Sequence, residues 1–420
     1  MTLTRTSLSF ALLVSAACAV DSRAFNENNS SLTPFGDGAG NGGGTNNGGT
    51  AGEPPSTAGS AGSSSGSGGS NGFNELPPDP DLDPIADEPD AAPTDTDPDP
   101  DPDPDPEDIP PSPSSDLPAP PVTGIARPAG AVANLRVLPW AGFRAAVSYT
   151  FDDANSSQIQ NYAALQNLAV PYTFYLQTNK PDAQNQVWAQ AVRDGHELGN
   201  HTQSHQSTGA NIGADTDAAS NFIESRFGVT VRTMAAPNGS TAYGPIASTR
   251  FLINRGVNDQ QISVRGTADP YNLPCYIPPT GTSTDTFNGK VNAVRTAGNW
   301  QVVLVHGFTG GNDGAFQPVE LAQFTASVQY TKSLGDIWID TVVDVAAYWL
   351  GQRLLGGVTP TSAAGVTTWN WSLPALFPPG QFLRVVVDGG TLRQGSTVLT
   401  WDEHGYYEVD LDAGTLSLSP

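Results

Sequence analysis

The stretch that decides the fold runs from residue 145 to residue 153 and reads Ala-Ala-Val-Ser-Tyr-Thr-Phe-Asp-Asp. Its apolar part, Ala145 to Phe151, is typical of a buried strand, and two carboxylates follow it directly. Residues 157–168 carry apolar side chains at helical spacing, and a second apolar strand is predicted over 170–176. Alternation of buried strands and amphipathic helices is typical of a β/α fold with parallel strands.

The same alternation continues to residue 350. It predicts further helices over 187–193, 214–227, 245–254, 290–296, 318–334 and 342–350, and further strands over 301–305 and 337–341. A barrel is the economical way to bury so many alternating elements. We therefore predict an α/β fold class, with a (β/α) barrel over residues 139–352 and its chemistry at the C-terminal ends of the strands.

The remaining C-terminal residues, 357–420, have the pattern of a small β-rich domain. Strands are predicted over 367–373, 382–387, 396–401 and 406–411. Asp-Gly-Gly at 388–390 and Asp-Ala-Gly at 412–414 are turn signals between them. Aromatic side chains alternate along these strands; they could form a sugar-stacking face, but a core position is the more usual one, and we favour it.

The N-terminal part of the chain has a different composition. Residues 1–19 have the positive start, short apolar run and small residues of a bacterial export signal. Cys18 lies in a sequence that fits either a lipoprotein cleavage box, with Cys18 lipidated, or an ordinary cleavage site. Residues 20–125 are rich first in Gly and Ser and then in Asp and Pro, which predicts a disordered linker. The expected location is therefore the cell envelope, by a lipid anchor, or the exterior.

Charge and cysteine content exclude several classes of protein. The chain of 420 residues has a formal net charge of −24. No Lys or Arg lies between Arg23 and Arg127, so most of this charge belongs to the predicted linker. No basic patch is available to neutralise phosphates, which disfavours a nucleic-acid partner. Only two cysteines are present, which excludes a disulfide scaffold and a cysteine-rich zinc module; Cys275 is interpreted as a packed thiol.

Three polar patches follow predicted apolar strands or helices. The first is the carboxylate pair Asp152 and Asp153, whose side chains must point in different directions on a strand; a turn or helix cap is the plain alternative. The second is the pair His201 and His205, whose spacing lets both imidazoles face one point, as metal ligands do. The third is His306, at the end of strand 301–305. Each patch alone has an ordinary structural explanation.

Together, and in this order, the patches resemble the polysaccharide deacetylase family, also called carbohydrate esterase family 4. The resemblance covers roughly residues 145–350, about half of the chain. It implies a distorted (β/α) barrel and an enzyme that removes acetyl groups from amino sugars or from xylan. The first family motif, T-F-D-D, is matched by residues 150–153, which makes Asp152 the general base and Asp153 a metal ligand. The second motif, H-[ST]-x-x-H, makes His201 and His205 the other ligands.

The later motifs are matched less completely. The L-x-H motif implies that Leu304 lines the pocket for the acetyl methyl group and that His306 is the general acid. The third motif has Ala235 where the family usually has the Arg that braces the catalytic Asp, and Arg265 is our candidate replacement, with a plain surface charge as the alternative. The backbone N–H of Asn238 remains available for an oxyanion site. No clean match exists for the Asp that orients the acid His.

The resulting hypothesis is a hydrolase that depends on one divalent metal ion, with zinc as the first choice, and that deacetylates an N- or O-acetylated polysaccharide of chitin, peptidoglycan or xylan type. Asp153, His201 and His205 would leave one position open on the metal. An acetylated polysaccharide is the expected partner, together with a lipid membrane if Cys18 is lipidated. The competing hypothesis is a non-catalytic sugar-binding or adhesion protein on a decayed deacetylase scaffold, which the missing Arg would favour.

Overall fold

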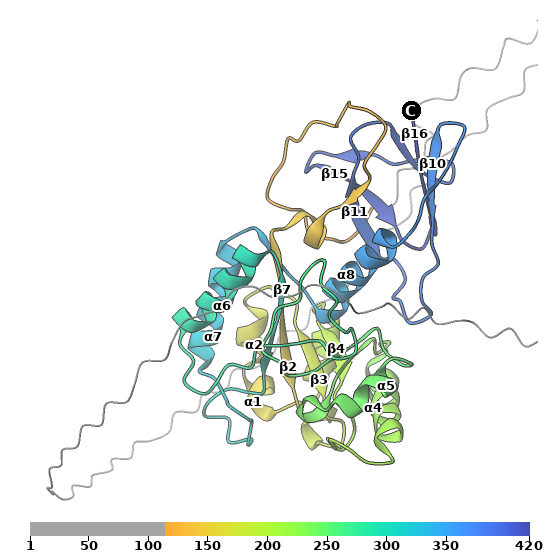
Figure 1. Ribbon diagram of the computed structural model, residues 1–420. Helices are drawn as coiled ribbons and strands as arrows, with labels where there is room; N and C mark the ends of the chain where they lie inside the picture. The colour runs from red at the N-terminus through yellow and green to blue at the C-terminus, as the bar shows by residue number, and fades with distance from the viewer. Residues whose placement is uncertain (1–113) are drawn as a thin grey trace, which may run out of the picture. The chain divides into compact units, whose positions relative to one another are not determined.

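The computed structural model describes residues 114–420 (Figure 1). The predicted signal segment and most of the predicted linker lie outside these residues. Residues 145–339 contain a curled sheet of seven strands, all paired in parallel. Its strands are β2 (Ala145–Asp152), β3 (Thr173–Leu176), β4 (Glu197–Asn200), β5 (Thr233–Ala235), β6 (Ile253–Arg255), β7 (Trp300–Val305) and β8 (Ile337–Ile339).

Strand β2 is the axis of this sheet, and all of its residues are buried. The strand order is β6-β5-β4-β3-β2-β7, with β8 paired to the first residues of β2. The gap between β6 and β7 is filled by residues 273–276, because Leu273 forms a parallel bridge with Arg255 and Tyr276 forms one with Val303. A curled parallel sheet covered by helices agrees with the predicted α/β barrel class.

The helices follow the strands in the expected alternation. They are α1 (Ser156–Gln160), α2 (Tyr162–Gln166), α3 (Val187–Arg193), α4 (Ile212–Phe227), α5 (Gly244–Ala247), α6 (Thr284–Ala297), α7 (Leu321–Ser333) and α8 (Val342–Gly356). One prediction is wrong: the helix over 245–254 ends at Ala247, and strand β6 begins at Ile253. Residues 251–253 are a buried apolar run, and periodicity alone cannot tell such a short run from a helix.

The C-terminal part of the chain forms two antiparallel sheets, here called the β-domain. One sheet has the order β1-β11-β15-β14 and the other β13-β12-β16-β10-β9. The bounds are β1 (Arg136–Val137), β9 (Thr361–Ala363), β10 (Val366–Asn370), β11 (Phe382–Val386), β12 (Thr391–Gln394), β13 (Thr397–Val398), β14 (Trp401–Asp402), β15 (Tyr406–Asp410) and β16 (Thr415–Ser419). Strand β1 precedes the barrel in sequence and the other strands follow it. The β-domain is therefore built from segments before and after the barrel.

Residues before β1 also belong to the β-domain. The Ser115 hydroxyl and backbone N–H both donate to Glu408, and the buried guanidinium of Arg384 donates to the carbonyls of Leu117 and Pro118. The backbone N–H of Ile125 donates to Glu403. These contacts start before residue 125, where the composition placed the end of the linker. Proline and acidic residues alone did not reveal that this end of the segment is anchored.

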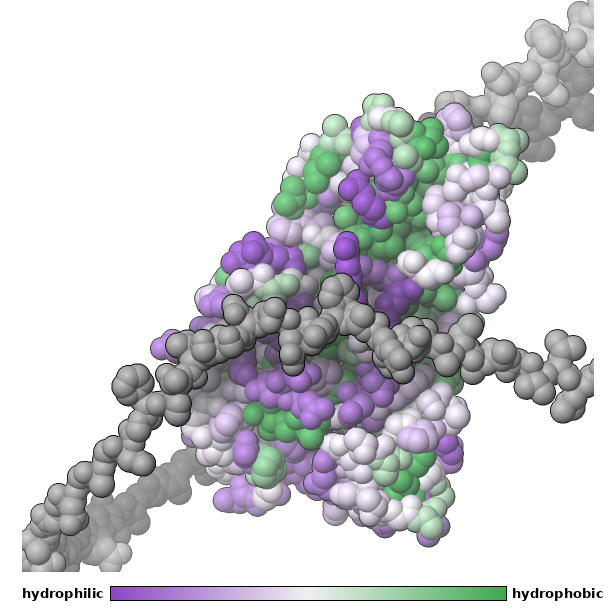
Figure 2. All heavy atoms as spheres, in the orientation of Figure 1, coloured by the Kyte–Doolittle hydropathy of each residue, from purple (hydrophilic) through white to green (hydrophobic). Residues whose placement is uncertain are grey.

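Helix α8 joins the barrel to the β-domain. Its buried residues share one apolar core with barrel tryptophans such as Trp300 and with β-domain residues such as Leu383. The helix approaches the β-domain closely at Gly351, where a Cβ atom would lie 2.7 Å from a methyl group of Leu411. Apolar surface is most continuous around the β-domain in Figure 2. Within residues 114–420, no helix combines the length and apolar composition of a membrane span.

Candidate metal and acid–base site

The polar patches predicted from the sequence converge at the C-terminal edge of the parallel sheet. Asp152 is the last residue of β2, His201 directly follows β4, and His306 directly follows β7. Because β2 and β7 pair with Phe151 opposite Val305, Asp152 and His306 come next in the same register. Parallel strands deliver their C-terminal ends to one edge, so residues far apart in sequence meet in one cavity of about 310 Å³.

Three side chains in this cavity form a possible metal site. The ligand atoms of Asp153, His201 and His205 all lie within 4.8 Å of one another. Asp153 Oδ1 is 3.3 Å from His201 Nε2 and 3.6 Å from His205 Nε2. His201 Nδ1 lies 2.8 Å from the carbonyl oxygen of Ala235, which fixes the ring and leaves Nε2 to face the carboxylate. The residues present therefore fit a divalent metal ion.

The electrostatics of this group favour a positive charge at its centre. Burial alone would raise the pKa of Asp153, but the hydrogen bond from His201 and the neighbouring imidazoles lower it below its ordinary value. Burial lowers the pKa of His205. For His201, burial acts in the same direction, yet the charges of Asp152 and Asp153 outweigh it and raise the pKa. The two carboxylates thus attract either a proton or a cation to this position.

Backbone strain is concentrated around the same residues. Asp153, Thr202, His205 and Asn238 all have positive φ angles, of 74°, 62°, 56° and 52°. Non-glycine residues avoid this left-handed region, at a cost of about 1–3 kcal/mol each. The surrounding structure therefore holds these residues in place against their local preference. Such strain often accompanies a functional site.

Asp152 is braced by an arginine that the sequence pattern did not identify. Its Oδ2 atom accepts a hydrogen bond from Arg255, and both side chains are almost completely buried. Arg255 pairs in register with Ala235, the position where the family motif usually carries its Arg. The guanidinium thus reaches Asp152 from the neighbouring strand.

The predicted support from Arg265 is wrong. Arg265 is exposed and lines a different groove, beside Arg136 and Arg353. Nothing in this loop carries its guanidinium to Asp152. A signal for Arg255 was present in the sequence, because an apolar run ending in a charged residue, at 251–255, resembles the other strand ends of the site.

His306 is held differently from the other two histidines. Burial lowers its pKa. Its Nδ1 atom is buried and has no hydrogen-bond partner among the described residues. The two candidates for an orienting carboxylate lie elsewhere: Asp259 pairs with Lys290, and Asp269 accepts from the backbone N–H of Tyr271. The rings of His306 and Phe316 instead form an edge-to-face pair, with centroids 5.4 Å apart.

The remaining walls of the cavity are largely apolar. Leu304, which is 1% exposed, and Asn238, which follows β5, both line it. Two lining residues are among the few large apolar side chains that are exposed on the described part of the chain: Val257 at 37% and Phe316 at 58%. Val257 follows β6 and Phe316 follows β7, so the cavity has apolar groups from both ends of the sheet.

The other candidate residues have structural positions. His196 is buried among Tyr172, Phe174 and Tyr162, and its Nδ1 accepts from the backbone N–H of Tyr172. Cys275 is a buried free thiol, as expected, with its Sγ atom 3.3 Å from the carbonyl of Gly256.

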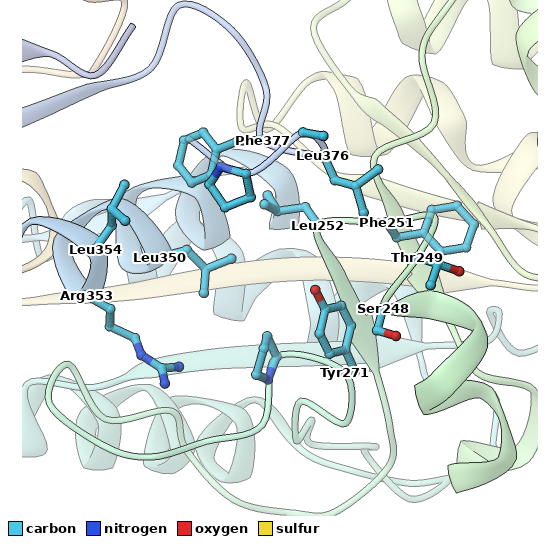
Figure 3. A pocket seen from close by; sticks show the side chains of 13 residues that line it. Ser248, Thr249, Phe251, Leu252, Tyr271, Leu350, Arg353, Leu354, Leu376 and Phe377 are labelled. Atoms are coloured by element: carbon cyan, nitrogen blue, oxygen red, sulfur yellow. The ribbon is translucent and has the colours of Figure 1, made fainter. Parts of the chain in front are cut away.

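A larger cavity, of about 730 Å³, lies between residues 248–271, helix α8 and residues 374–377. Figure 3 shows aromatic and leucine side chains around it, including Phe251, Tyr271 and Phe377. Arg353 is the one charged side chain among its described lining residues. This cavity therefore lacks the groups that acid–base or metal chemistry needs.

A family model described as polysaccharide deacetylase matches residues 144–251. The matched stretch contains the Asp-Asp pair and both histidines of the metal group, and it ends before Arg255 and His306. The match agrees with the family that the sequence motifs predicted for this part of the chain.

Single proteins are similar to the chain at low identity. A gellan lyase from a Bacillus species is 26% identical over 253 residues, which are 51% of this chain and only 10% of the lyase. A family 4 acetyl xylan esterase from Clostridium thermocellum, solved with a cobalt ion, is 17% identical, with a TM-score of 0.35 and coverage of 49% of this chain and 91% of the esterase. A peptidoglycan N-acetylglucosamine deacetylase from Eubacterium rectale is 19% identical, with a TM-score of 0.34 and coverage of 51% and 92%.

Proposed function

We propose that the protein is a metal-dependent hydrolase that removes acetyl groups from an N- or O-acetylated polysaccharide. The match of residues 144–251 to the polysaccharide deacetylase model supports this function. One observation carries the proposal: the ligand group Asp153, His201 and His205 shares a cavity with a braced carboxylate, Asp152, and a strand-end imidazole, His306. Hydrolysis of an acetamide needs an activated water, a stabilised oxyanion and a protonated leaving group, and this arrangement has a group for each.

The two oxygens of Asp152 have separate tasks in this proposal. Arg255 holds Oδ2, whereas Oδ1 is buried without a hydrogen-bond partner among the described residues. Oδ1 is therefore the atom that accepts the proton of the attacking water. The buried ion pair also keeps the carboxylate oriented toward the metal group, since Oδ2 is 3.6 Å from His201 Nε2.

The other residues act on the acetyl group and the leaving atom. His306 donates a proton to the departing nitrogen or oxygen. The backbone N–H of Asn238 faces the developing oxyanion, and Leu304 contacts the acetyl methyl group. A divalent ion bound by Asp153, His201 and His205 would lower the pKa of water and polarise the acetyl carbonyl. Zinc is our first choice, although one carboxylate and two imidazoles also suit other divalent ions.

The exposed ring of Phe316 indicates the kind of substrate. A pyranose has an apolar face of C–H groups, which stacks on an aromatic ring, and Phe316 lies directly beside His306. Arg255, the one arginine or lysine among the described residues that line the cavity, is paired with Asp152 and buried. We therefore propose a neutral pyranose next to the scissile acetyl group.

Activity assays with three substrates test this function. Acetate release is measured from N-acetylated chitin oligomers, acetylxylan and an aryl acetate, with and without a chelator. We expect metal-dependent release, which Asp152→Asn abolishes on all substrates while metal content is retained. His306→Ala should slow amide hydrolysis far more than aryl ester hydrolysis, because an aryl leaving group needs no proton. Absence of acetate release with every substrate and metal would favour the sugar-binding alternative. That alternative rested on Ala235, and Arg255 now supplies the missing brace.

We also propose export to the cell envelope, supported by the signal-like residues 1–19. Labelling of the cells with a radioactive fatty acid distinguishes the two processing routes. Incorporation that is lost in Cys18→Ser indicates a lipid anchor, whereas an unlabelled protein in the medium indicates ordinary cleavage.

A further inference from the structure

The amide of Gln158 joins the strand ends that carry the two proposed acid–base residues. Gln158 lies in the first turn of α1 and is 1% exposed. Its Nε2 atom donates to the carbonyl oxygen of Asp152, at 2.5 Å, and to the carbonyl oxygen of His306, at 2.8 Å. The β2–β7 ladder ends one residue earlier, at Phe151 and Val305. One side-chain amide thus takes the place of the next rung between the two strands.

This arrangement leaves a buried polar atom unsatisfied. The Oε1 atom of Gln158 has no hydrogen-bond partner among the described residues. The amide cannot be turned round to relieve this, because Oε1 would then face two carbonyl oxygens. A buried acceptor without a partner costs about 1–3 kcal/mol. A residue kept at such a cost is a candidate for a functional rather than a purely stabilising role.

The N-cap residue and the first turn of α1 also contact His306 and the segment that follows it. Asn155 Nδ2 donates to the carbonyl of His306 at 2.7 Å, and the backbone N–H of Phe308 donates to the Ser157 hydroxyl at 3.0 Å. Glycine is required at 307 because a Cβ atom there would lie 2.6 Å from the Ser157 hydroxyl oxygen. The loop that carries the imidazole is therefore seated directly on this turn.

We propose that Gln158 is a positioning residue that fixes His306 relative to Asp152, with Asn155 as the second contact to the His306 carbonyl. The proposal rests on the proposed deacetylase function for its catalytic readout. His306 needs such a support because its Nδ1 atom has no hydrogen-bond partner among the described residues. Without the amide bridge, Asp152 is still paired with Tyr175 of β3 and with Arg255, whereas His306 lies beyond the last pair of the β2–β7 ladder. Loss of the bridge should therefore displace the acid more than the metal group.

The test compares Gln158→Met with Gln166→Met. Methionine keeps the length of the side chain and fills the space without a donor. Gln166 provides the control because its amide oxygen contacts His196, away from the cavity, at 2.8 Å. Values of kcat/KM are measured for an N-acetyl amide and for an aryl acetate. A displacement of about 1 Å in a catalytic group costs about 10²-fold.

We expect Gln158→Met to lose about 10²-fold on the amide and at least tenfold less on the aryl ester, with metal content unchanged. Gln158→Asn, which keeps the amide but is shorter, should fall in between. The control Gln166→Met should affect the two substrates equally. If Gln158→Met also lowered both activities by the same factor, its role would be purely structural and the proposal would be overturned.

A crystal structure of Gln158→Met tests the amide bridge independently of any activity measurement. Carbonyl oxygens of Asp152 and His306 in unchanged positions would refute it, and displacement of the His306 loop would support it. An inactive wild-type protein would count against the proposed function alone, since the crystallographic result still decides on the bridge. If Gln158→Met does not fold, the same comparison is made with Gln158→Asn.

Discussion

Replacement of Arg255 by methionine tests the central ion pair of the site. The Arg255 and Asp152 side chains are 1% and 2% exposed, so the substitution leaves a buried carboxylate without its cation. Removal of one partner of a buried pair costs about 3–5 kcal/mol, because the remaining charge stays desolvated. Asp152 Oδ1 already lacks a hydrogen-bond partner among the described residues, so no other donor compensates. We expect a loss in the unfolding free energy within that range.

The same substitution should remove the general base. Without the guanidinium, Asp152 loses the group that orients it toward the metal group, and base catalysis of this kind contributes about 10²–10⁴-fold. Urea unfolding gives the free energy, and kcat/KM with an aryl acetate gives the activity. Arg265→Met is the matched control: this arginine is exposed and remote from the cavity, so its loss should change stability by less than about 0.5 kcal/mol.

A double-mutant cycle makes the test independent of general effects of the substitution. Asp152→Asn removes the carboxylate charge, so the double variant with Arg255→Met contains no unpaired buried charge. Its stability should recover most of the loss seen in Arg255→Met alone, which gives a coupling energy well above the additive expectation. Additive free energies, or an Arg255→Met protein as stable and active as the wild type, would refute the reasoning. Loss of activity in Arg265→Met would restore Arg265 as the brace.

Three further predictions concern the metal group, the substrate and the response to pH. His201→Ala or His205→Ala should abolish bound metal, measured by elemental analysis, with an unchanged circular dichroism spectrum; stoichiometric metal in the double variant would contradict the ligand assignment. Phe316→Ala should raise KM for an oligosaccharide by roughly fivefold, since an aromatic contact contributes about 1 kcal/mol, with little effect on an aryl acetate; equal effects on both would argue against stacking. Burial raises the pKa of Glu197 from 4.5 to about 7, so the folded state binds the extra proton and stability should fall as pH rises between those values, by at most about 3 kcal/mol. Glu197→Gln should flatten this dependence in thermal unfolding, and an unchanged slope would assign it to other groups.

The sequence was most informative where a long apolar strand ends in polar residues. Strand β2 and the positions of Asp152 and Asp153 were predictable because the mainly apolar run from Ala145 to Phe151 is buried and both carboxylates follow it directly. His306 was predictable for the same reason. Strands β4 and β5 were missed because each has only three or four residues and no long apolar run, and β6 was missed because the apolar residues at its start were assigned to a helix.

Arg255 was missed as a consequence. Its place in the site depends on the register that sets it beside Ala235, and register between short parallel strands has no signature in the sequence. Gln158 was missed for a related reason. A glutamine in an amphipathic helix is usually a solvated residue, and only the three-dimensional placement of two carbonyl groups gives it a special role.

The β-domain has a consequence for the order in which the chain can fold. Strand β1 lies before the barrel, but it pairs with β11, whose residue Val386 stands opposite Arg136. Arg384 likewise donates to the carbonyls of Leu117 and Pro118, which lie far before it in the chain. During synthesis, these early residues must wait until the barrel and strand β11 have emerged. The barrel can close from contacts within itself, whereas the β-domain closes last and over the longest loop, which makes it the slower step of assembly.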